Sequence, residues 1–276
     1  MAAPFKYNYA IVSRIPDSFK KQHPDVDLEH ARADLEKYVD LLRRLGIDVL
    51  ELPADEKHPE CVNVDDTAVV INGTALMCCP PERQGEVNVI RQTLRRELGL
   101  KIVEIQNPSK VALEGGDVLF TGKEIIVALS QQTNEAGAQA VASAFPEYAT
   151  TPVKIPNGYH LKDLVCMAGR DIMIHGSSRT VEDIMRQIRI HASFGYSTIA
   201  LEDDHASNGL YCNGTLVHLS DKQMSGKSFG TLENKIDFPR QALDMESLLK
   251  GESCLTRVAM LVGKAKYPKK IVSTLD

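Results

Sequence analysis

The stretch DTAVVINGTALMCC, residues 66–79, predicts a β-hairpin that sets the fold of this chain. Two apolar, β-branched runs flank Asn72-Gly73, a pair that favours a tight turn because both residues tolerate positive φ. A second stretch, DVLFTGKEIIVALS at residues 117–130, repeats the pattern around Thr121-Gly122. Further versions follow at residues 167–176, at residues 209–219 around Asn213-Gly214, and less regularly at residues 254–263. We therefore expect a repeating architecture.

Amphipathic helices are predicted beside several of these hairpins. After a first strand at residues 9–12, apolar residues recur at helical spacing from Leu28 to Leu42, with Asp27 as the N-cap and Gly46 at the end. Similar patterns cover residues 87–98 and 181–191. Each helix then returns through a short strand that completes the unit, and these strands are predicted at residues 47–52, 101–105, 153–155 and 198–201. The repeating unit is thus strand, strand, helix, strand.

Five residues of different chemistry open the successive hairpins at intervals of 46 to 49 positions: Asp65, Glu114, His160, Asn208 and Cys254. A closed ring of five units would remove exposed sheet edges and bring these residues to a central axis. Polar groups at the start of apolar strands are costly to bury unless they are paired or used. The sequence therefore predicts an α/β chain with one domain over residues 1–276, a five-bladed propeller of ββαβ units around a central active site.

Composition excludes several other classes. The 276 residues carry a net charge of −5, so nucleic acid is not an expected partner, and we interpret the basic cluster at residues 264–270 as a solvated strand end. No apolar run is long enough to span a bilayer. The six cysteines show no Cys-x-x-Cys pair, and the N-terminus lacks the pattern of a signal peptide. We expect a cytoplasmic protein with reduced thiols and no membrane contact.

Four strings in order make the chain recognisable: NVDDTAVV at 63–70, LEGGDVLFTGKE at 113–124, GYHLKDLVCMAG at 158–169 and GESCLT at 251–256. Together they resemble the dimethylarginine dimethylaminohydrolases. The resemblance implies the pentein propeller of the arginine deiminase superfamily, which agrees with the five predicted units. It also implies a small-molecule guanidine substrate, no cofactor, no metal, a monomer or homodimer, and a place in arginine metabolism and nitric oxide regulation.

The resemblance also assigns roles. The catalytic residues it implies are Cys254 as nucleophile, His160 as general acid and base, and Glu114 as the carboxylate that orients the histidine. The substrate-binding residues it implies are Asp65 and Asp66 for the guanidinium, Glu60 as a further acid, and Arg83 for the α-carboxylate. Three departures lie near the substrate. Gln132 stands where the family usually carries Arg, Asn63 replaces an aromatic residue, and residues 75–83 are shorter by two positions.

These residue types suit the hydrolysis of a guanidine. A guanidinium is a poor electrophile, so the catalyst must hold it with carboxylates, attack it with a thiolate and protonate the departing amine. The predicted reaction converts Nω-methylated L-arginine to citrulline and a methylamine through a covalent thiouronium on Cys254. Two alternatives stay open: the same mechanism on another guanidine, and a non-catalytic binding module.

Other polar residues have plainer interpretations. Cys78, Cys79, Cys166 and Cys212 lie within apolar runs and are expected in the core, and His175 and His218 are expected to be structural. Asp117 is either a functional residue or a turn aspartate that stabilises Gly115-Gly116. Asp163 is either a solvated turn residue or an acid at the rim of the pocket.

Overall fold

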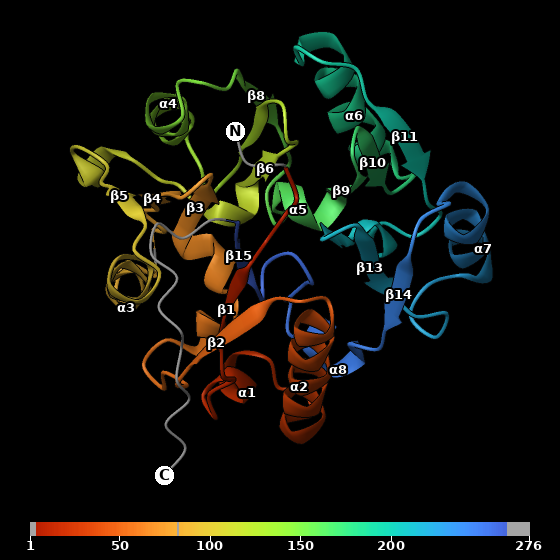
Figure 1. Ribbon diagram of the computed structural model, residues 1–276, viewed down its shortest axis with the longest axis horizontal. Helices are drawn as coiled ribbons and strands as arrows, with labels where there is room; N and C mark the ends of the chain where they lie inside the picture. Colours follow the sequence, from red (N-terminus) through yellow and green to blue (C-terminus); the bar gives the residue numbers. More distant parts are fainter. Residues whose placement is uncertain (1–3, 82, 264–276) are drawn as a thin grey trace.

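The computed structural model describes residues 4–81 and 83–263, which form five small sheets arranged around a centre, with the longer helices on the outside (Figure 1). Each sheet has three strands, and its middle strand runs antiparallel to one neighbour and parallel to the other. The predicted five-unit ββαβ propeller is thereby confirmed. The basic cluster at residues 264–270 lies outside the described residues.

Four sheets follow the chain in order. They are β3 (Ala68–Ile71), β4 (Thr74–Met77) and β5 (Lys101–Val103); β6 (Val118–Phe120), β7 (Ile125–Leu129) and β8 (Thr150–Lys154); β9 (Val165–Gly169), β10 (Ile172–His175) and β11 (Ser197–Ala200); and β12 (Leu210–Cys212), β13 (Thr215–Leu219) and β14 (Arg240–Leu243). Strand β8 begins three residues before its predicted start and contains Pro152. The proline is tolerated because β8 is an edge strand, whose outer face needs no N–H donor.

The fifth sheet joins the two ends of the described chain. Strand β15 (Met260–Val262) pairs antiparallel with β1 (Tyr9–Ser13), and β1 pairs parallel with β2 (Asp48–Leu52). The less regular fifth repeat is explained by this arrangement. Its partner strand comes from the other end of the sequence, so the unit has no local hairpin turn.

The asparagine–glycine turns adopt the predicted conformation. Asn72 and Gly73 have φ values of 49° and 78°, and Asn213 and Gly214 have values of 49° and 86°. Two consecutive positive φ angles match the right-handed twist of the flanking strands. These turns set the register of β3 with β4 and of β12 with β13.

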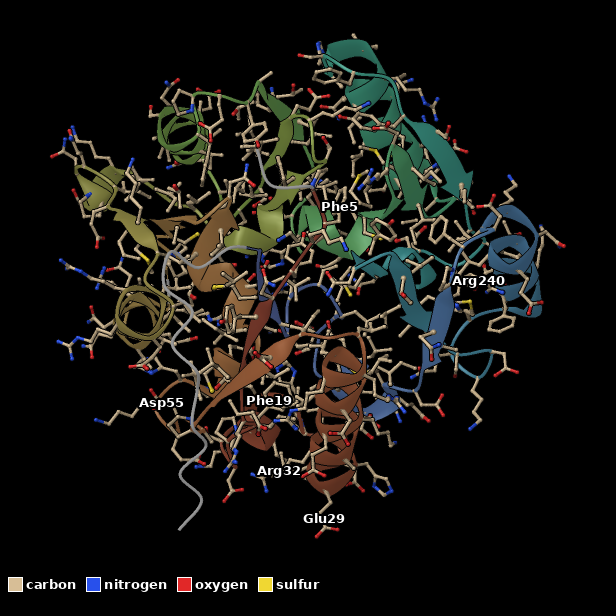
Figure 2. All side chains as sticks on the ribbon, viewed as in Figure 1. Phe5, Phe19, Glu29, Arg32, Asp55 and Arg240 are labelled. Atoms are coloured by element: carbon tan, nitrogen blue, oxygen red, sulfur yellow. The ribbon has the colours of Figure 1, made fainter. Side chains whose placement is uncertain are left out.

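Helices lie over the three ranges predicted from apolar periodicity, residues 28–42, 87–98 and 181–191, and two further helices at residues 135–144 and 226–235 had no prediction. The longer helices are α2 (Leu28–Arg44), α4 (Glu135–Ala144), α6 (Arg179–His191), α7 (Gly226–Lys235), and α3 (Val87–Gln92), which continues into a wider turn at Thr93–Glu97. Asp27 caps α2 by accepting from the His30 N–H at 3.1 Å, as predicted. Short helices are α1 (Phe19–Gln22), α5 (Leu161–Leu164) and α8 (Glu246–Leu249). Phe19 is buried, whereas Glu29 in α2 points into solvent (Figure 2).

A short helical turn precedes the first strand of each of the four consecutive units. These turns are η2 (Val64–Thr67), η5 (Gly115–Asp117), α5 and η6 (His205–Ser207). Around the centre of the molecule, η5 contacts both η2 and α5, and α5 contacts η6. The residues at the ends of these turns are therefore brought together although they lie far apart in sequence.

The described part of the chain contains no helix with the length and apolar character needed to cross a membrane.

Candidate active site

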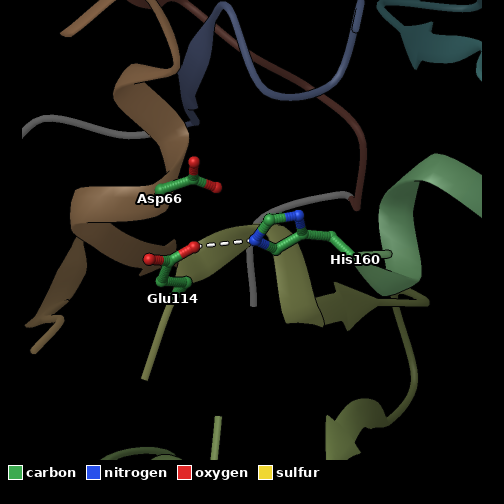
Figure 3. Close-up of side chains that lie close together, drawn as sticks. All are labelled: Asp66, Glu114 and His160. Carbon is green, nitrogen blue, oxygen red and sulfur yellow. Dashed lines mark hydrogen bonds and ion pairs between the residues drawn. The ribbon is translucent and has the colours of Figure 1, made fainter. Parts of the chain in front are cut away.

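Buried Glu114 and partly buried His160 form a pair at the centre of the ring. Glu114 precedes η5 and His160 precedes α5, and the contact between these turns places His160 Nε2 2.7 Å from Glu114 Oε2 (Figure 3). On the other side of the ring, His160 Nδ1 lies 3.5 Å from Asp163 Oδ2. The same Asp163 oxygen accepts from the backbone N–H of His160 at 3.0 Å, as part of a capping box. The imidazole is thus held at both nitrogens.

Two glycines make this approach possible. A Cβ on Gly115 would lie 1.9 Å from the carbonyl oxygen of Asp65, and one on Gly116 would lie 2.7 Å from Asp66 Oδ1 and 2.9 Å from His160 Cδ2. The EGGD string is therefore a steric requirement of the site as well as a turn. Asp117 does not simply stabilise this turn. Its carboxylate accepts from the Leu161 N–H at 3.2 Å and from Ser130 Oγ at 2.6 Å, which holds α5 in place.

The environment of His160 favours the imidazolium. Burial and the nearby Arg257 act to lower the pKa of His160, but hydrogen bonds to Asp163 and Glu114 and the charge of Asp66 raise the pKa to about 10. At neutral pH the ring is therefore protonated and able to donate a proton.

Cys254 lies on the other side of Asp163. Its Sγ is 3.3 Å from Asp163 Oδ1 and 3.4 Å from Thr256 Oγ1. Tyr38 of α2 holds this segment by donating to the Leu255 carbonyl at 2.7 Å. Burial and the Asp163 carboxylate raise the pKa of the Cys254 thiol, and Arg257 opposes them. The site thus combines a thiol with an imidazolium.

Cys254, His160 and Asp163 open into one cavity of about 740 Å³, which Glu60, Gln132, Asn63 and Asn208 also line. Of the two interpretations of Asp163, the acid at the pocket is confirmed. Asn63 and Asn208 each bury a side-chain oxygen that has no hydrogen-bond partner within residues 4–81 and 83–263. Such oxygens accept N–H donors, which a guanidinium supplies.

The two adjacent acids face different ways. Asp66 is fully buried and accepts from Arg83 Nη1 at 2.7 Å, from Arg257 Nη2 at 2.8 Å and from the Gly116 N–H at 3.1 Å. Burial opposes its ionisation, but the guanidinium groups of Arg257 and Arg83 hold the pKa of Asp66 below its usual range. Asp65 instead pairs with Lys162 and lines a separate cavity of about 110 Å³. Asp65 is not among the described residues that line the 740 Å³ cavity.

Arg83 is also committed within the protein. Its Nε and Nη2 donate to the two carboxylate oxygens of Glu86 at 2.8 and 2.7 Å, and Nη2 also reaches the carbonyls of Glu60 and Asn63. The described residues that line the 740 Å³ cavity do not include Arg83.

Three side chains, Asp66, Glu114 and His160, have ligand atoms within 4.8 Å of one another, a spacing at which such groups can hold a metal cation (Figure 3). His160 Nε2 is already bonded to Glu114, and two guanidinium groups already contact Asp66. These arginines would repel a further cation. We therefore assign the cluster to the Glu114–His160 pair.

Comparison with known proteins agrees with this geometry. The family profile described as N,N dimethylarginine dimethylhydrolase, eukaryotic, matches residues 12–168, more than half of the chain. The chain belongs to the dimethylarginine dimethylaminohydrolase family. It is accordingly a hydrolase of linear amidines that acts on C–N bonds other than peptide bonds, as the resemblance implied.

Relatives in the dimethylarginine dimethylaminohydrolase family span humans and bacteria. A human protein described as putative hydrolase DDAH2 is 36% identical over 215 residues, which cover 74% of each chain. The N(G),N(G)-dimethylarginine dimethylaminohydrolase of Pseudomonas aeruginosa is 24% identical over 65% of this chain and 69% of its own length.

Solved structures confirm the pentein fold. A mutant of the Pseudomonas aeruginosa enzyme, solved with citrulline, has a TM-score of 0.78 at 18% identity and covers 93% of this chain and 100% of its own. The N-terminal domain of ArgZ, a cyanobacterial arginine dihydrolase solved with its substrate, has a TM-score of 0.75 at 14% identity, with 93% and 98% covered.

Sequence reasoning missed Arg257. This arginine is buried and contacts Asp66 through Nε and Nη2 and the Glu252 carbonyl through Nη1. A signal was present, because a charged residue within an apolar strand-like run must find a buried partner. Gln132, the departure from the family pattern, lines the cavity.

The histidine interpretations agree with the structure, and so do three of the four cysteine interpretations, whereas the prediction that Cys79 lies in the core is wrong, because its side chain is partly exposed. His175 and His218 are buried and bind backbone carbonyls through Nδ1 at 2.7 and 2.8 Å. Cys78, Cys166 and Cys212 are buried core thiols, and Cys79 is partly exposed. The described residues that line the cavity around Cys254 include none of these histidines and cysteines.

Proposed function

We propose that this protein hydrolyses Nω-methylated L-arginine to citrulline and a methylamine or dimethylamine, with Cys254 as nucleophile. Membership of the family supports the reaction class, and the Pseudomonas aeruginosa relative, described as an N(G),N(G)-dimethylarginine dimethylaminohydrolase, supports the choice of a methylated arginine. The observation that carries the proposal is local. A Glu114–His160 pair at 2.7 Å and Cys254 share one cavity, with Asp163 in contact with both the histidine and the cysteine.

The reaction uses these groups in two stages. The Cys254 thiolate forms an S–C bond to the central guanidinium carbon, and the C–N bond to the methylated nitrogen breaks as His160 gives that amine a proton. The product of this stage is a thiouronium on Cys254. In the second stage His160 takes a proton from water, whose oxygen bonds to the same carbon. The S–C bond then breaks, which leaves citrulline and free Cys254.

The protonation states suit this order. His160 has a raised pKa of about 10, so it begins the cycle as the acid that the departing amine requires. The thiol of Cys254 has a raised pKa because of burial and the Asp163 charge. A cationic guanidinium beside Sγ would offset that charge and favour the thiolate.

The test is a panel of guanidines assayed by mass spectrometry for the ureido product. Wild-type protein should convert Nω-methyl-L-arginine and asymmetric dimethyl-L-arginine, and Cys254→Ser should bind them without turnover, since an alcohol is far less nucleophilic than a thiolate at neutral pH. An acid-quenched wild-type sample should carry a mass adduct on Cys254. Near wild-type kcat in the serine variant would rule out the covalent route.

A second substrate, a guanidine without an α-carboxylate, is favoured by the charges of the cavity. Among the described residues, its lining contains the acids Glu60, Asp163, Asp204, Glu246 and Glu252 and two side chains with a fixed positive charge, Lys250 and Arg257. Arg257 lies at the nucleophile end, and Lys250 is paired with Glu246 at 2.9 Å. The other expected carboxylate partner, Arg83, is occupied by Asp66 and Glu86.

Each methylarginine in the panel should therefore be matched with its decarboxylated analogue. Preference for the amino acid supports the first substrate, and preference for the analogue supports the second. Absence of ureido product from both, with binding retained, would instead support a non-catalytic binding module.

A further inference from the structure

We infer that Asp163 is the carboxylate that binds the cationic amidinium or guanidinium group of the substrate beside Cys254, in place of the Asp65–Asp66 pair. This inference depends on the proposed function in one respect only, which is that a cationic ligand must approach Cys254 Sγ. It assigns a substrate-recognition role to the residue that follows His160 by three positions.

The position of Asp163 meets the geometric requirement. A nucleophilic attack needs the central carbon roughly 3–3.5 Å from the sulfur, and the nitrogens of a guanidinium lie about 1.3 Å from that carbon. Asp163 Oδ1 is 3.3 Å from Cys254 Sγ, so it lies within hydrogen-bond reach of a nitrogen on an attacked guanidinium. The carboxylate also lines the cavity and is 26% exposed.

Asp66 does not meet this requirement. Its side chain is 0% exposed, and both of its oxygens already accept from arginine guanidinium groups. A substrate cation would have to displace Arg257, which is itself 8% exposed and bound at Nη1 by the Glu252 carbonyl. Asp163 is therefore the acid that is open to the cavity, whereas Asp66 is already paired with two arginines.

Asp163 keeps an acceptor available. Its Oδ2 is engaged by the backbone N–H and the ring of His160. Its Oδ1 has the thiol of Cys254 at 3.3 Å and Arg257 Nη1 only at 3.7 Å, beyond ordinary hydrogen-bond length. When the thiol is ionised, its hydrogen-bond donor is lost, and a substrate N–H can take its place on Oδ1.

A matched pair of alkylating reagents isolates this role. 2-Chloroacetamidine is a cation and 2-chloroacetamide is a neutral analogue of nearly the same shape. Each forms an S–C bond with the Cys254 thiolate while the C–Cl bond breaks, chloride leaves, and the thiol proton passes to solvent. The ratio of the two rate constants at one pH reports recognition of the cation, because changes in thiol reactivity affect both reagents.

In the wild type the amidine should react faster than the amide. Asp163→Asn should lower the ratio about tenfold or more, since a charge-assisted bond is lost. Glu246→Gln is the control, because Glu246 lines the same cavity but is paired with Lys250 at 2.9 Å, and it should leave the ratio within about twofold. Asp163→Glu, which keeps the charge, should restore part of the preference. Peptide mapping must locate the label on Cys254.

An unchanged ratio in Asp163→Asn would overturn the inference and leave Asp163 as the cap of α5. If that variant does not fold, Asp163→Ser, which retains a short acceptor for the His160 N–H, provides the same comparison. Because alkylation needs no turnover, a reduced ratio together with an inactive guanidine panel would uphold this inference while the proposed substrate fails.

Discussion

The guanidinium of Arg83 lies 2.7 Å from the carboxylate of Asp66, so an arginine expected to hold a substrate carboxylate holds a buried acid of the protein. Its remaining donors bind Glu86, which is also buried. Removal of one partner of such a cluster leaves uncompensated charge in the interior, which typically costs about 3–5 kcal/mol.

Arg83→Met should therefore act on stability. The melting temperature should fall on the order of 10 °C, because each kcal/mol shifts it by roughly 2–4 °C in a domain of this size. Arg91→Met is the matched control, since Arg91 forms an exposed pair with Glu104 at 2.7 Å, and exposed pairs are worth about 0–1 kcal/mol. Calorimetry of both variants checks the expectation. An unchanged melting temperature with a much higher KM would show instead that Arg83 binds the substrate.

Glu114→Gln should move the alkaline limb of the pH–rate profile. Imidazolium is the acid in the first stage, so activity should persist toward the His160 pKa of about 10 and fall above it. Loss of the Glu114 charge disfavours the imidazolium, lowers this pKa and shifts the limb to lower pH. His160→Gly should reduce kcat further than Glu114→Gln, because it removes the proton donor itself. The opposite order would contradict the assigned roles.

The same protonation has a consequence for stability. The pKa of His160 is raised on folding, so the contribution of the imidazolium is fully present below about pH 6.5 and is lost as the pH rises through about 10. The free energies of unfolding of wild type and His160→Gly, measured by denaturant titration across this pH window, should become equal at its upper end. A constant difference between them would show that the loss of stability has another cause.

Gln132→Arg separates the two substrates. One charge-assisted bond to a carboxylate is worth roughly 1.5–3 kcal/mol, so the change should raise kcat/KM for Nω-methyl-L-arginine about tenfold or more. For a decarboxylated analogue the same arginine is an unpaired cation and should reduce turnover. Steady-state kinetics on both compounds makes the comparison. Equal rates in both proteins would show that Gln132 makes no contact with the substrate, although it lines the cavity.

Gly116→Ala should impair catalysis through a single methyl group. The added Cβ would meet Asp66 Oδ1 at 2.7 Å and His160 Cδ2 at 2.9 Å, so the Asp66 carboxylate or the imidazole must shift from its present position. We expect kcat to fall by about a hundredfold. Gly230→Ala is the control, because its Cβ meets nothing within 4 Å and it lies within α7, where alanine favours the helix. Full activity in Gly116→Ala would refute the steric account.

The sequence by itself determined the backbone of this protein. Asn-Gly turns, apolar alternation and helical periodicity are local properties, so Asn72-Gly73 and the α2 pattern predicted their elements directly. The spacing of five hairpins predicted the ring, and four strings predicted the family. The 2.7 Å contact of Glu114 with His160 follows from that ring.

Only the tertiary structure decided where each charge finds its partner. Asp65 and Asp66 are neighbours in sequence, yet one pairs with Lys162 and the other with Arg83 and Arg257. Buried charges select partners through space, and the ring brings Lys162 and Arg257 from distant units. The antiparallel pairing of β15 with β1 likewise depends on closure of the whole ring. Local pattern fixes backbone geometry, whereas the pairing of Asp163 with Cys254, 91 positions away, exists only once the turns meet at the centre.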